Sequence, residues 1–312
     1  MADPVLHIKD SYFFEVPKSM WRHDYKSVLD VPEFLRKAHP DATATEWNKA
    51  LSGKILIPQP FGTLKNLYEK ESGFAISKYM VLEVLAAVVL YFIFKRFADR
   101  ISSKEPPKGA FDNLIETLVL FVRDGIARKA IHHHPDHFVP ILGTMFFFIL
   151  ALNLFGLIPW LGSPTAAFGV TSALALVILL TSLVAGTKEF GPVGMWTNMV
   201  PHIDMPAWLT PLKWIIQLML LIIESIGLLV KHAVLGVRLL ANIVAGHLVL
   251  VAILAMITAA AGAASHVYWT TATIATLASI ALSVLELGVA FLQAFVFTFL
   301  SALFINMASH AH

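Results

Sequence analysis

The chain has 312 residues, of which 57% are hydrophobic and 14% are charged. A soluble domain usually has about a quarter charged residues, so this composition excludes an ordinary soluble protein. The net charge of +2 is too small to indicate a nucleic-acid partner, and the absence of cysteine excludes disulfides and thiolate metal sites. Nineteen of the 23 Lys and Arg residues lie in residues 1–137. Long stretches without charged residues indicate a membrane protein.

Residues 1–76 are polar and mixed, without an apolar run long enough to span a bilayer. We expect an external polar tail with short helices. The first membrane helix is predicted at 77–95, where an apolar run ends at Lys95 and Arg96. Residues 96–137 are predicted to be a cytoplasmic linker and an interfacial amphipathic helix, because apolar residues such as Leu114 and Leu118 recur on one side.

Residues 138–186 are predicted to form a membrane helical hairpin that turns at the sequence NLFGLIP, and residues 187–212 a cytoplasmic loop. The remaining apolar runs, 214–259 and 266–307, each exceed forty residues and contain no proline. At 1.5 Å per residue such helices are longer than about 60 Å, against a hydrocarbon core of about 30 Å. We therefore expect two long tilted helices over 213–308.

The distribution of basic residues predicts the orientation. Residues 95–137 contain eight Lys and Arg, and the connection 159–167 contains none. Because basic loops stay in the cytoplasm, the amino terminus is expected outside and the carboxyl terminus inside. The predicted fold class is an all-α integral membrane protein with one N-terminal span, an interfacial amphipathic helix, a helical hairpin and two long tilted membrane helices.

Polar residues recur at helical spacing in both long runs. Glu224, Lys231 and Arg238 are seven residues apart, Asn242 follows on the same face, and Glu286 and Gln293 are again seven apart. A charge at bilayer depth costs about 2.5–3.5 kcal/mol on insertion scales, so such residues usually line a cavity or an ion path. An internal ion pair between Glu224 and Lys231 is the alternative. Arg238 has no acid within four residues, which indicates a partner elsewhere, including on another chain.

Three segments together resemble one known family. The sequence HAVLGVRLLANIVAGHLVL (232–250) resembles the arginine-bearing helix of subunit a of the F-type ATP synthases. The sequence LELGVAFLQAFVFTFLSALFI (285–305) is similar to the last helix of that family, and NLFGLIP (153–159) to its hairpin turn. The resemblance covers about residues 75–307, and the three motifs occur in the same order.

The resemblance implies a stator subunit in the membrane sector of the ATP synthase, not an enzyme by itself and without a cofactor. Such a subunit forms two proton half-channels against a rotating ring of small proteolipid subunits with buried carboxylates. By this analogy Arg238 separates the half-channels and forces the ring carboxylates to ionise. The expected surroundings are a bacterial inner membrane, its lipid bilayer and the membrane subunits of the peripheral stalk.

The resemblance also implies a set of proton-path residues. These are Asn242, His247, Glu286, Gln293 and Glu224, with Lys231, Asn153, Thr165 and Thr171 as further candidates. Many relatives have additional acidic or polar residues after the hairpin turn, where this chain has Ala167 and Gly169. A proton path through that segment therefore depends on the two threonines or on water.

Two other classes of protein compete with this interpretation. A self-contained ion transporter or channel would also place charges in membrane helices, but the halves show no internal repeat. A membrane metal enzyme could use the histidine-rich segment from His132 to His137. Membrane enzymes of that kind need several such segments, and here there is one and no HExxH motif, so no metal site is expected.

Overall fold

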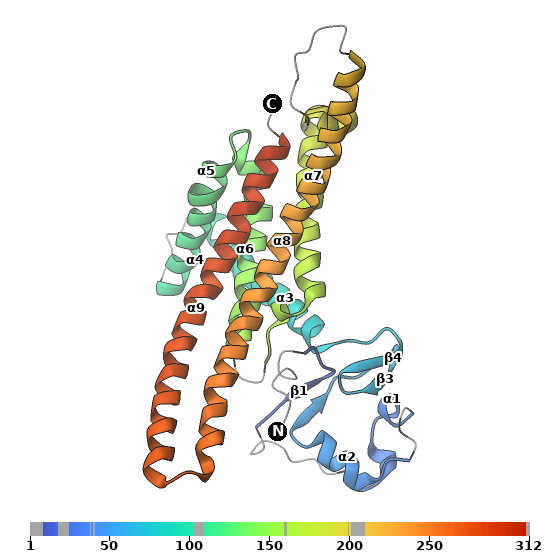
Figure 1. Ribbon diagram of the computed structural model, residues 1–312, viewed down its shortest axis with the longest axis vertical. Coiled ribbons are helices and arrows are strands. Elements are labelled where there is room, and N and C mark those ends of the chain that lie inside the picture. The colour runs from blue at the N-terminus through green and yellow to red at the C-terminus, as the bar shows by residue number, and fades with distance from the viewer. Residues whose placement is uncertain are drawn as a thin grey trace. The chain divides into compact units, whose positions relative to one another are not determined.

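The computed structural model describes residues 9–17, 25–37, 39, 41–102, 109–158, 161–198, 200 and 210–309. The chain divides into two compact units. The first unit contains residues 1–89, 151–167 and 243–287, and the second contains 90–150, 168–242 and 288–312. Long helices dominate both units, and the strands of the described chain all lie before residue 74 (Figure 1). The prediction of an all-α membrane protein is confirmed.

The N-terminal part of the first unit, residues 9–77, is a small folded domain. Its elements are β1 Phe13–Glu15, η3 Val28–Asp30, α1 Glu33–Arg36, α2 Ala44–Leu51, β2 Lys54–Leu56, β3 Gly62–Asn66 and β4 Glu69–Gly73. Strand β1 pairs antiparallel with β2, and β3 with β4. Val31, Leu35, Trp47, Leu51 and Leu64 form its buried core. The sequence predicted short helices here, and the structure adds four short strands.

Several polar contacts attach the N-terminal domain to the start of the next helix. The backbone N–H of Lys78 donates to the Ser11 carbonyl at 2.7 Å, and that of Tyr79 to Asp10 Oδ1 at 3.2 Å. Burial raises the pKa of Asp10 above its ordinary value, although hydrogen bonds from Ser77 and from backbone N–H groups act in the opposite direction. The domain and the beginning of that helix therefore form one hydrogen-bonded assembly.

The rest of the chain is helical. Its elements are α3 Lys78–Ser102, α4 Ala110–Leu120, the π-helix η4 Phe121–Ala127, α5 Arg128–Ala130, α6 Pro135–Gly156, η5 Pro164–Ala166, α7 Phe168–Asn198, α8 Thr210–Ala259, η7 Ala260–Gly262 and α9 Ser265–Ser309. In the described chain, α6, α7, α8 and α9 are long and apolar enough to cross a membrane. Helix α3 is not among these four, because its uncharged run is limited by Glu83 near its start and by Lys95 and Arg96 at its end, and its membrane crossing stays a prediction.

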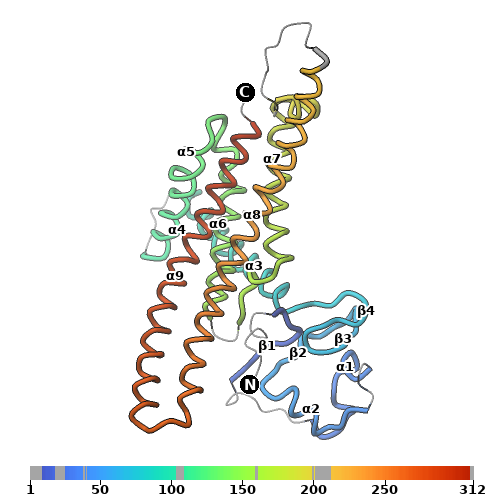
Figure 2. Tube along the Cα trace, in the orientation of Figure 1, coloured from blue at the N-terminus to red at the C-terminus, as the bar shows by residue number. Residues whose placement is uncertain are grey.

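Helices α8 and α9 contain 50 and 45 residues. They are joined by a short turn around residues 260–264 and run antiparallel on either side of it (Figure 2). Apart from Pro211 in the first turn of α8, where proline is tolerated, the two helices contain no proline, which explains their continuity, because an internal proline removes a helical hydrogen bond. Helix α7 continues past the predicted hairpin, to Asn198, but it consists of two helical segments separated at Gly191, whose φ of 75° and ψ of 170° are not helical.

The second unit is packed around aromatic and aliphatic side chains. Phe121 of the π-helix lies 6.2 Å from Phe146 and 6.1 Å from Phe291 between ring centroids, so the amphipathic segment packs on α6 and α9. An ion pair between Arg100 and Asp112 joins α3 to α4. These contacts hold the predicted amphipathic helix against membrane helices of the same unit.

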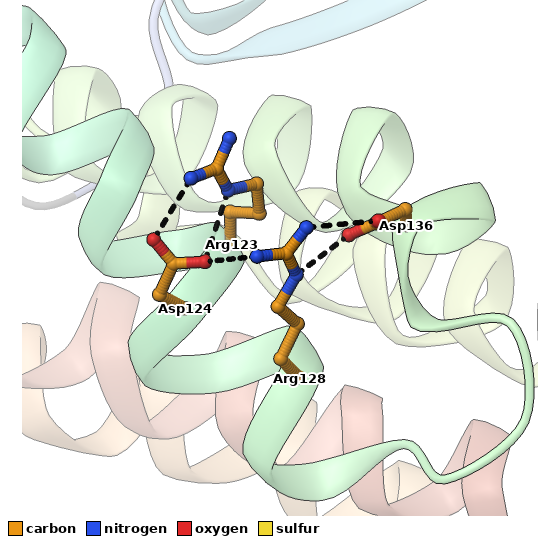
Figure 3. A network of polar contacts seen from close by, with 4 residues as sticks. All are labelled: Arg123, Asp124, Arg128 and Asp136. Carbon is orange, nitrogen blue, oxygen red and sulfur yellow. Dashed lines mark hydrogen bonds and ion pairs between the residues drawn. The ribbon is translucent and has the colours of Figure 1, made fainter.

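The polar face of that segment has a chain of four charged side chains (Figure 3). Arg128 donates to both carboxylate oxygens of Asp136 at 2.9 Å, and also to Asp124, which accepts two bonds from Arg123. The hydrogen bonds from Arg123 hold the pKa of Asp124 below its ordinary value. All four groups are exposed, and exposed pairs usually stabilise by only about 0–1 kcal/mol, so the network orients the end of this segment more than it stabilises the fold.

Candidate functional site: polar residues of the long helices

Arg238 lies on α8 with its side chain exposed. Its helical neighbours Leu235 and Leu239 are buried in the core of the second unit. Within the part of the chain that the structure describes, no hydrogen bond or ion pair involves the Arg238 guanidinium. The side chain therefore points away from the core of its own unit, on a helix that is largely apolar.

Two amides belong to the same part of the helix pair. Asn242 follows Arg238 by four residues, which puts it on the same face one turn further along α8, and it is half-buried. Gln293 of α9 is buried, with 8% of its surface exposed. In the second unit the rings of His232 and Phe304 are 4.6 Å apart, which fixes α8 and α9 as antiparallel neighbours there.

Glu224 and Lys231 form the ion pair that the sequence left open. Lys231 Nζ lies 3.2 Å from Glu224 Oε1, and both side chains are about 40% exposed (39% and 40%). Their spacing of seven residues brings them to one side of α8, two turns apart. Glu224 thus has a counter-ion inside its own helix, in contrast to Arg238.

His247 and Glu286 line one pocket of the first unit, with a volume of about 420 Å³. Glu286 Oε1 is buried and has no hydrogen-bond partner among the described residues. Gly246 faces this carboxylate so closely that a Cβ atom there would lie 2.5 Å from Oε1. The structure therefore places in one pocket a histidine and a carboxylate that the resemblance implies for the proton path, and Gly246, which no motif indicated, lies against the carboxylate.

The same pocket is lined by residues that the sequence analysis did not connect with it. Ser283 lies one turn before Glu286 on α9, and the hairpin connection contributes Gly156 and Gly162. Lys9, Glu15 and other residues of the N-terminal domain complete the lining. In the sequence, the position of Ser283 three residues before the glutamate was a possible sign that it lines the pocket. No local pattern connects residues 9–15 with residue 286.

Asn153, Thr165 and Thr171 are fully buried. Thr165 Oγ1 donates to Asn153 Oδ1 at 2.9 Å and lies 2.9 Å from Ser163 Oγ, inside the hairpin connection. The hydroxyl of Thr171 donates to the Phe168 carbonyl at 3.2 Å, at the start of α7. Asn153 and Thr165 therefore satisfy each other's buried polar atoms at the turn.

The histidine-rich segment does not gather metal ligands. Among the described residues, no three His, Asp or Glu side chains are grouped so that they could hold a metal ion. The backbone N–H of His132 donates to Asn306 Oδ1 at 3.1 Å, and Asp136 is occupied by Arg128. These contacts give the segment a role in joining α5, α6 and α9 of the second unit.

These features define a class of protein: a multi-pass helical membrane protein with an arginine exposed on one long helix, and with a histidine and a glutamate, one from each long helix, that line a shared pocket. The family model for the ATP synthase A chain matches residues 80–306. The chain belongs to the ATP synthase A chain family, and the resemblance seen in its motifs is confirmed.

Curated relatives extend over most of the chain. ATP synthase subunit a of Myxococcus xanthus is 37% identical over 235 residues, which is 75% of this chain and 73% of the relative. The protein of the same name from Chloroherpeton thalassium is 35% identical, over 80% of this chain and 72% of its own length. That of an Anaeromyxobacter species is 34% identical over 98% of this chain and 70% of the relative, so the similarity includes the N-terminal domain.

Proposed function

We propose that this chain is the stator subunit of the ATP synthase membrane sector and conducts protons through two half-channels that meet a rotating ring of small proteolipid subunits. The observation that supports this most directly is Arg238, exposed on an apolar helix and without a counter-ion in the described chain. Because an uncompensated charge at bilayer depth is expensive, its partner is expected on another chain.

The chemistry of a guanidinium suits a barrier between two channels. Arginine is not deprotonated in proteins, so it cannot pass a proton along. It can pair with a carboxylate and lower the pKa of that acid, which forces the acid to release its proton. A ring carboxylate would therefore lose its proton before reaching Arg238 and regain one after leaving it.

The other polar residues have places in this scheme. Asn242 and Gln293 flank Arg238 on α8 and α9, and His247 with Glu286 forms the relay of the outer half-channel. Glu224 belongs to the inner half-channel, where it is paired with Lys231. Asn153, Thr165 and Thr171 are the weakest members, because the first two are already bonded to each other.

The proposed setting follows from the family. The relatives are named as subunits of the ATP synthase, so the chain acts within that complex and catalyses no reaction alone. Its partners are the proteolipid ring, the membrane subunits of the peripheral stalk and the lipid of a bacterial inner membrane. The amino terminus lies outside and the carboxyl terminus in the cytoplasm.

Replacement of Arg238 tests the proposal. Arg238→Ala is expected to abolish ATP-driven proton pumping and ATP synthesis in membrane vesicles while the complex still assembles. Passive proton leakage should rise, because nothing then forces ring carboxylates to ionise. Arg238→Lys keeps a cation but loses the planar donor fork, and a buried lysine can become neutral, so little coupled activity is expected.

Arg123→Ala is the matched control, since Arg123 is an exposed arginine paired with Asp124 outside the proposed path. It should pump at nearly the normal rate. Coupled pumping by Arg238→Ala at a similar rate would contradict the proposal. Proton conduction by the purified chain, reconstituted without proteolipid, would instead favour a self-contained channel.

A further inference from the structure

The pocket that contains Glu286 is lined on one side by the N-terminal domain. Lys9, Ser11, Phe13 and Glu15 line it along β1 and the residues before it, and Tyr68 lines it from the turn between β3 and β4. The opposite side is formed by α8 and α9 with His247, Ser283 and Glu286, and all of these residues belong to the first unit. Two segments far apart in sequence therefore share one cavity, whose lining includes charged and hydroxyl side chains.

The side of the pocket that the N-terminal domain forms is held in place by several hydrogen bonds. Strand β1 pairs with β2 through Phe13 and Leu56, and Gln59 exchanges two hydrogen bonds with the backbone of Ile76, at 2.9 and 2.8 Å. Together with the bond from the Lys78 N–H to the Ser11 carbonyl, these contacts fix β1 at the beginning of α3. We therefore expect β1 to keep a fixed position along this side of the pocket.

Lys78 connects the domain with the hairpin connection. Its side chain is buried, with 6% of its surface exposed. A Cβ atom at Gly162 would lie 3.2 Å from both Cε and Nζ of Lys78, so the ammonium stem passes directly over this glycine. Gly162 has a φ of 75°, which glycine adopts without strain. The lysine and Glu15 thus place charges of both signs along the lining.

Hydroxyl side chains of α9 continue from this pocket into an adjoining one that is otherwise apolar. Ser279 and Ser283, four residues apart, share one helix face and line an adjoining pocket with Thr276. The 420 Å³ cavity has room for several water molecules. Water bonded to these hydroxyl and charged groups would connect the buried Oε1 of Glu286 with the solvent around the N-terminal domain.

We propose that the N-terminal domain forms the outer mouth of the proton path, so that protons reach Glu286 between strand β1 and the serine face of α9. This inference rests on the proposed function, because it assumes that Glu286 takes part in proton transfer. It assigns a role to Lys9, Glu15, Lys78 and Ser283 that the motifs of the long helices do not suggest.

Access to the mouth can be measured directly, because the chain contains no cysteine. In the assembled complex, Ser283→Cys should react with the membrane-impermeant cation methanethiosulfonate ethyltrimethylammonium from the side of the N-terminal domain. Leu285→Cys is the matched control, since it is two residues away and exposed but does not line the pocket. The reagent reacts with the hydrated thiolate, so Ser283→Cys should react at least about tenfold faster than Leu285→Cys. Equal rates would overturn the proposal.

Blocking the N-terminal wall is the second test. A bulky maleimide on Glu15→Cys should remove most of the proton flux that the unlabelled variant shows, and Lys9→Cys gives an independent position on the same wall. Ser72→Cys, exposed on β4 outside the pocket, should keep its flux after labelling. Each variant is compared with itself before and after reaction, so an effect of the substitution alone does not enter.

Two results would separate this inference from the proposed function. If labelled Glu15→Cys and Lys9→Cys conduct normally while Glu286→Gln abolishes pumping, the N-terminal domain is no part of the path and only this inference fails. If Glu286→Gln itself pumps normally, the proposed function of that residue fails.

Discussion

At the scale of single residues, Gly246 lies directly against the Glu286 carboxylate. A Cβ atom at this position would lie 2.5 Å from Oε1 and 3.3 Å from Cδ. Gly246→Ala should therefore displace the end of a flexible side chain without breaking the helix pair. Misplacement of a reacting group by about 1 Å can cost about a hundredfold in rate, so we expect a loss of about ten- to hundredfold in proton flux per assembled complex, measured in membrane vesicles.

Gly227→Ala is the control for that substitution. It changes a glycine of the same helix that has open space where the methyl group would go. Proton flux in this variant should stay normal. Equal flux in Gly246→Ala and Gly227→Ala would show that the position of the Glu286 carboxylate does not limit proton transfer.

The site residues differ in how far the sequence could predict them. Arg238 and Glu286 were evident because charge is rare in 214–312 and costly in lipid. The exposure of Arg238 was not predictable, since a helical pattern does not say which face packs on other helices. The importance of Gly246 depends on its contact with Glu286, which is forty residues away in sequence. The local spacing of residues does not reveal such a contact.

At the scale of helices, α7 and α8 approach each other closely at Gly236. A Cβ atom there would lie 2.9 Å from the Thr171 carbonyl oxygen and 3.3 Å from Ala175 Cβ. Because the nearest atom belongs to the backbone, it cannot move aside easily. Gly236→Ala gains about 0.5–1 kcal/mol of helix propensity, but overpacking usually costs about 1–3 kcal/mol.

We therefore expect Gly236→Ala to lower the thermal stability of the purified complex or its yield of assembly. Gly227→Ala again serves as the comparison, because it receives the propensity gain without a close neighbour and should be equal to the unchanged protein or slightly more stable. Greater stability of Gly236→Ala than of Gly227→Ala would mean that the two helices separate at no cost.

The same scale shows which elements were predictable. Helices α8 and α9 follow from long, proline-free apolar runs, and their turn from the small residues after 259. The strands of the N-terminal domain did not follow, because they are three to five residues long and all five residues of β4 are exposed. Such short strands depend on partners distant in sequence. Within α7 the helical conformation is interrupted at Gly191, directly before Pro192, in keeping with the rule that such a pair usually marks a helix end.

At the scale of the whole molecule, the apolar surface of α8 shows that the chain is built for surroundings it does not itself contain. Almost none of the most apolar part of α8 is buried within the chain, and residues such as Ile222, Ile226 and Val237 are exposed. In water such a surface would cause aggregation. In a membrane it is available to lipid and to the proposed ring, and Arg238 lies on the same helix.

The orientation of the chain is the prediction that concerns the molecule as a whole. In intact cells, single cysteines at Phe61 and Ala110 should differ in their reaction with a membrane-impermeant thiol reagent. Phe61→Cys, at a position that is 71% exposed in the N-terminal domain, should react from outside. Ala110→Cys, at the start of α4 and among the eight Lys and Arg of 95–137, should react only after permeabilisation.

The physical reason is that basic residues beside membrane helices are retained in the cytoplasm, whereas long tails cross the membrane largely regardless of charge. The ten Lys and Arg of residues 1–77 therefore do not oppose the orientation. Met307→Cys, exposed near the end of α9, should behave like Ala110→Cys. Labelling of Ala110→Cys and Met307→Cys in intact cells, with Phe61→Cys protected, would turn the proposed proton mouth towards the cytoplasm and exchange the inner and outer assignments of Glu224 and Glu286.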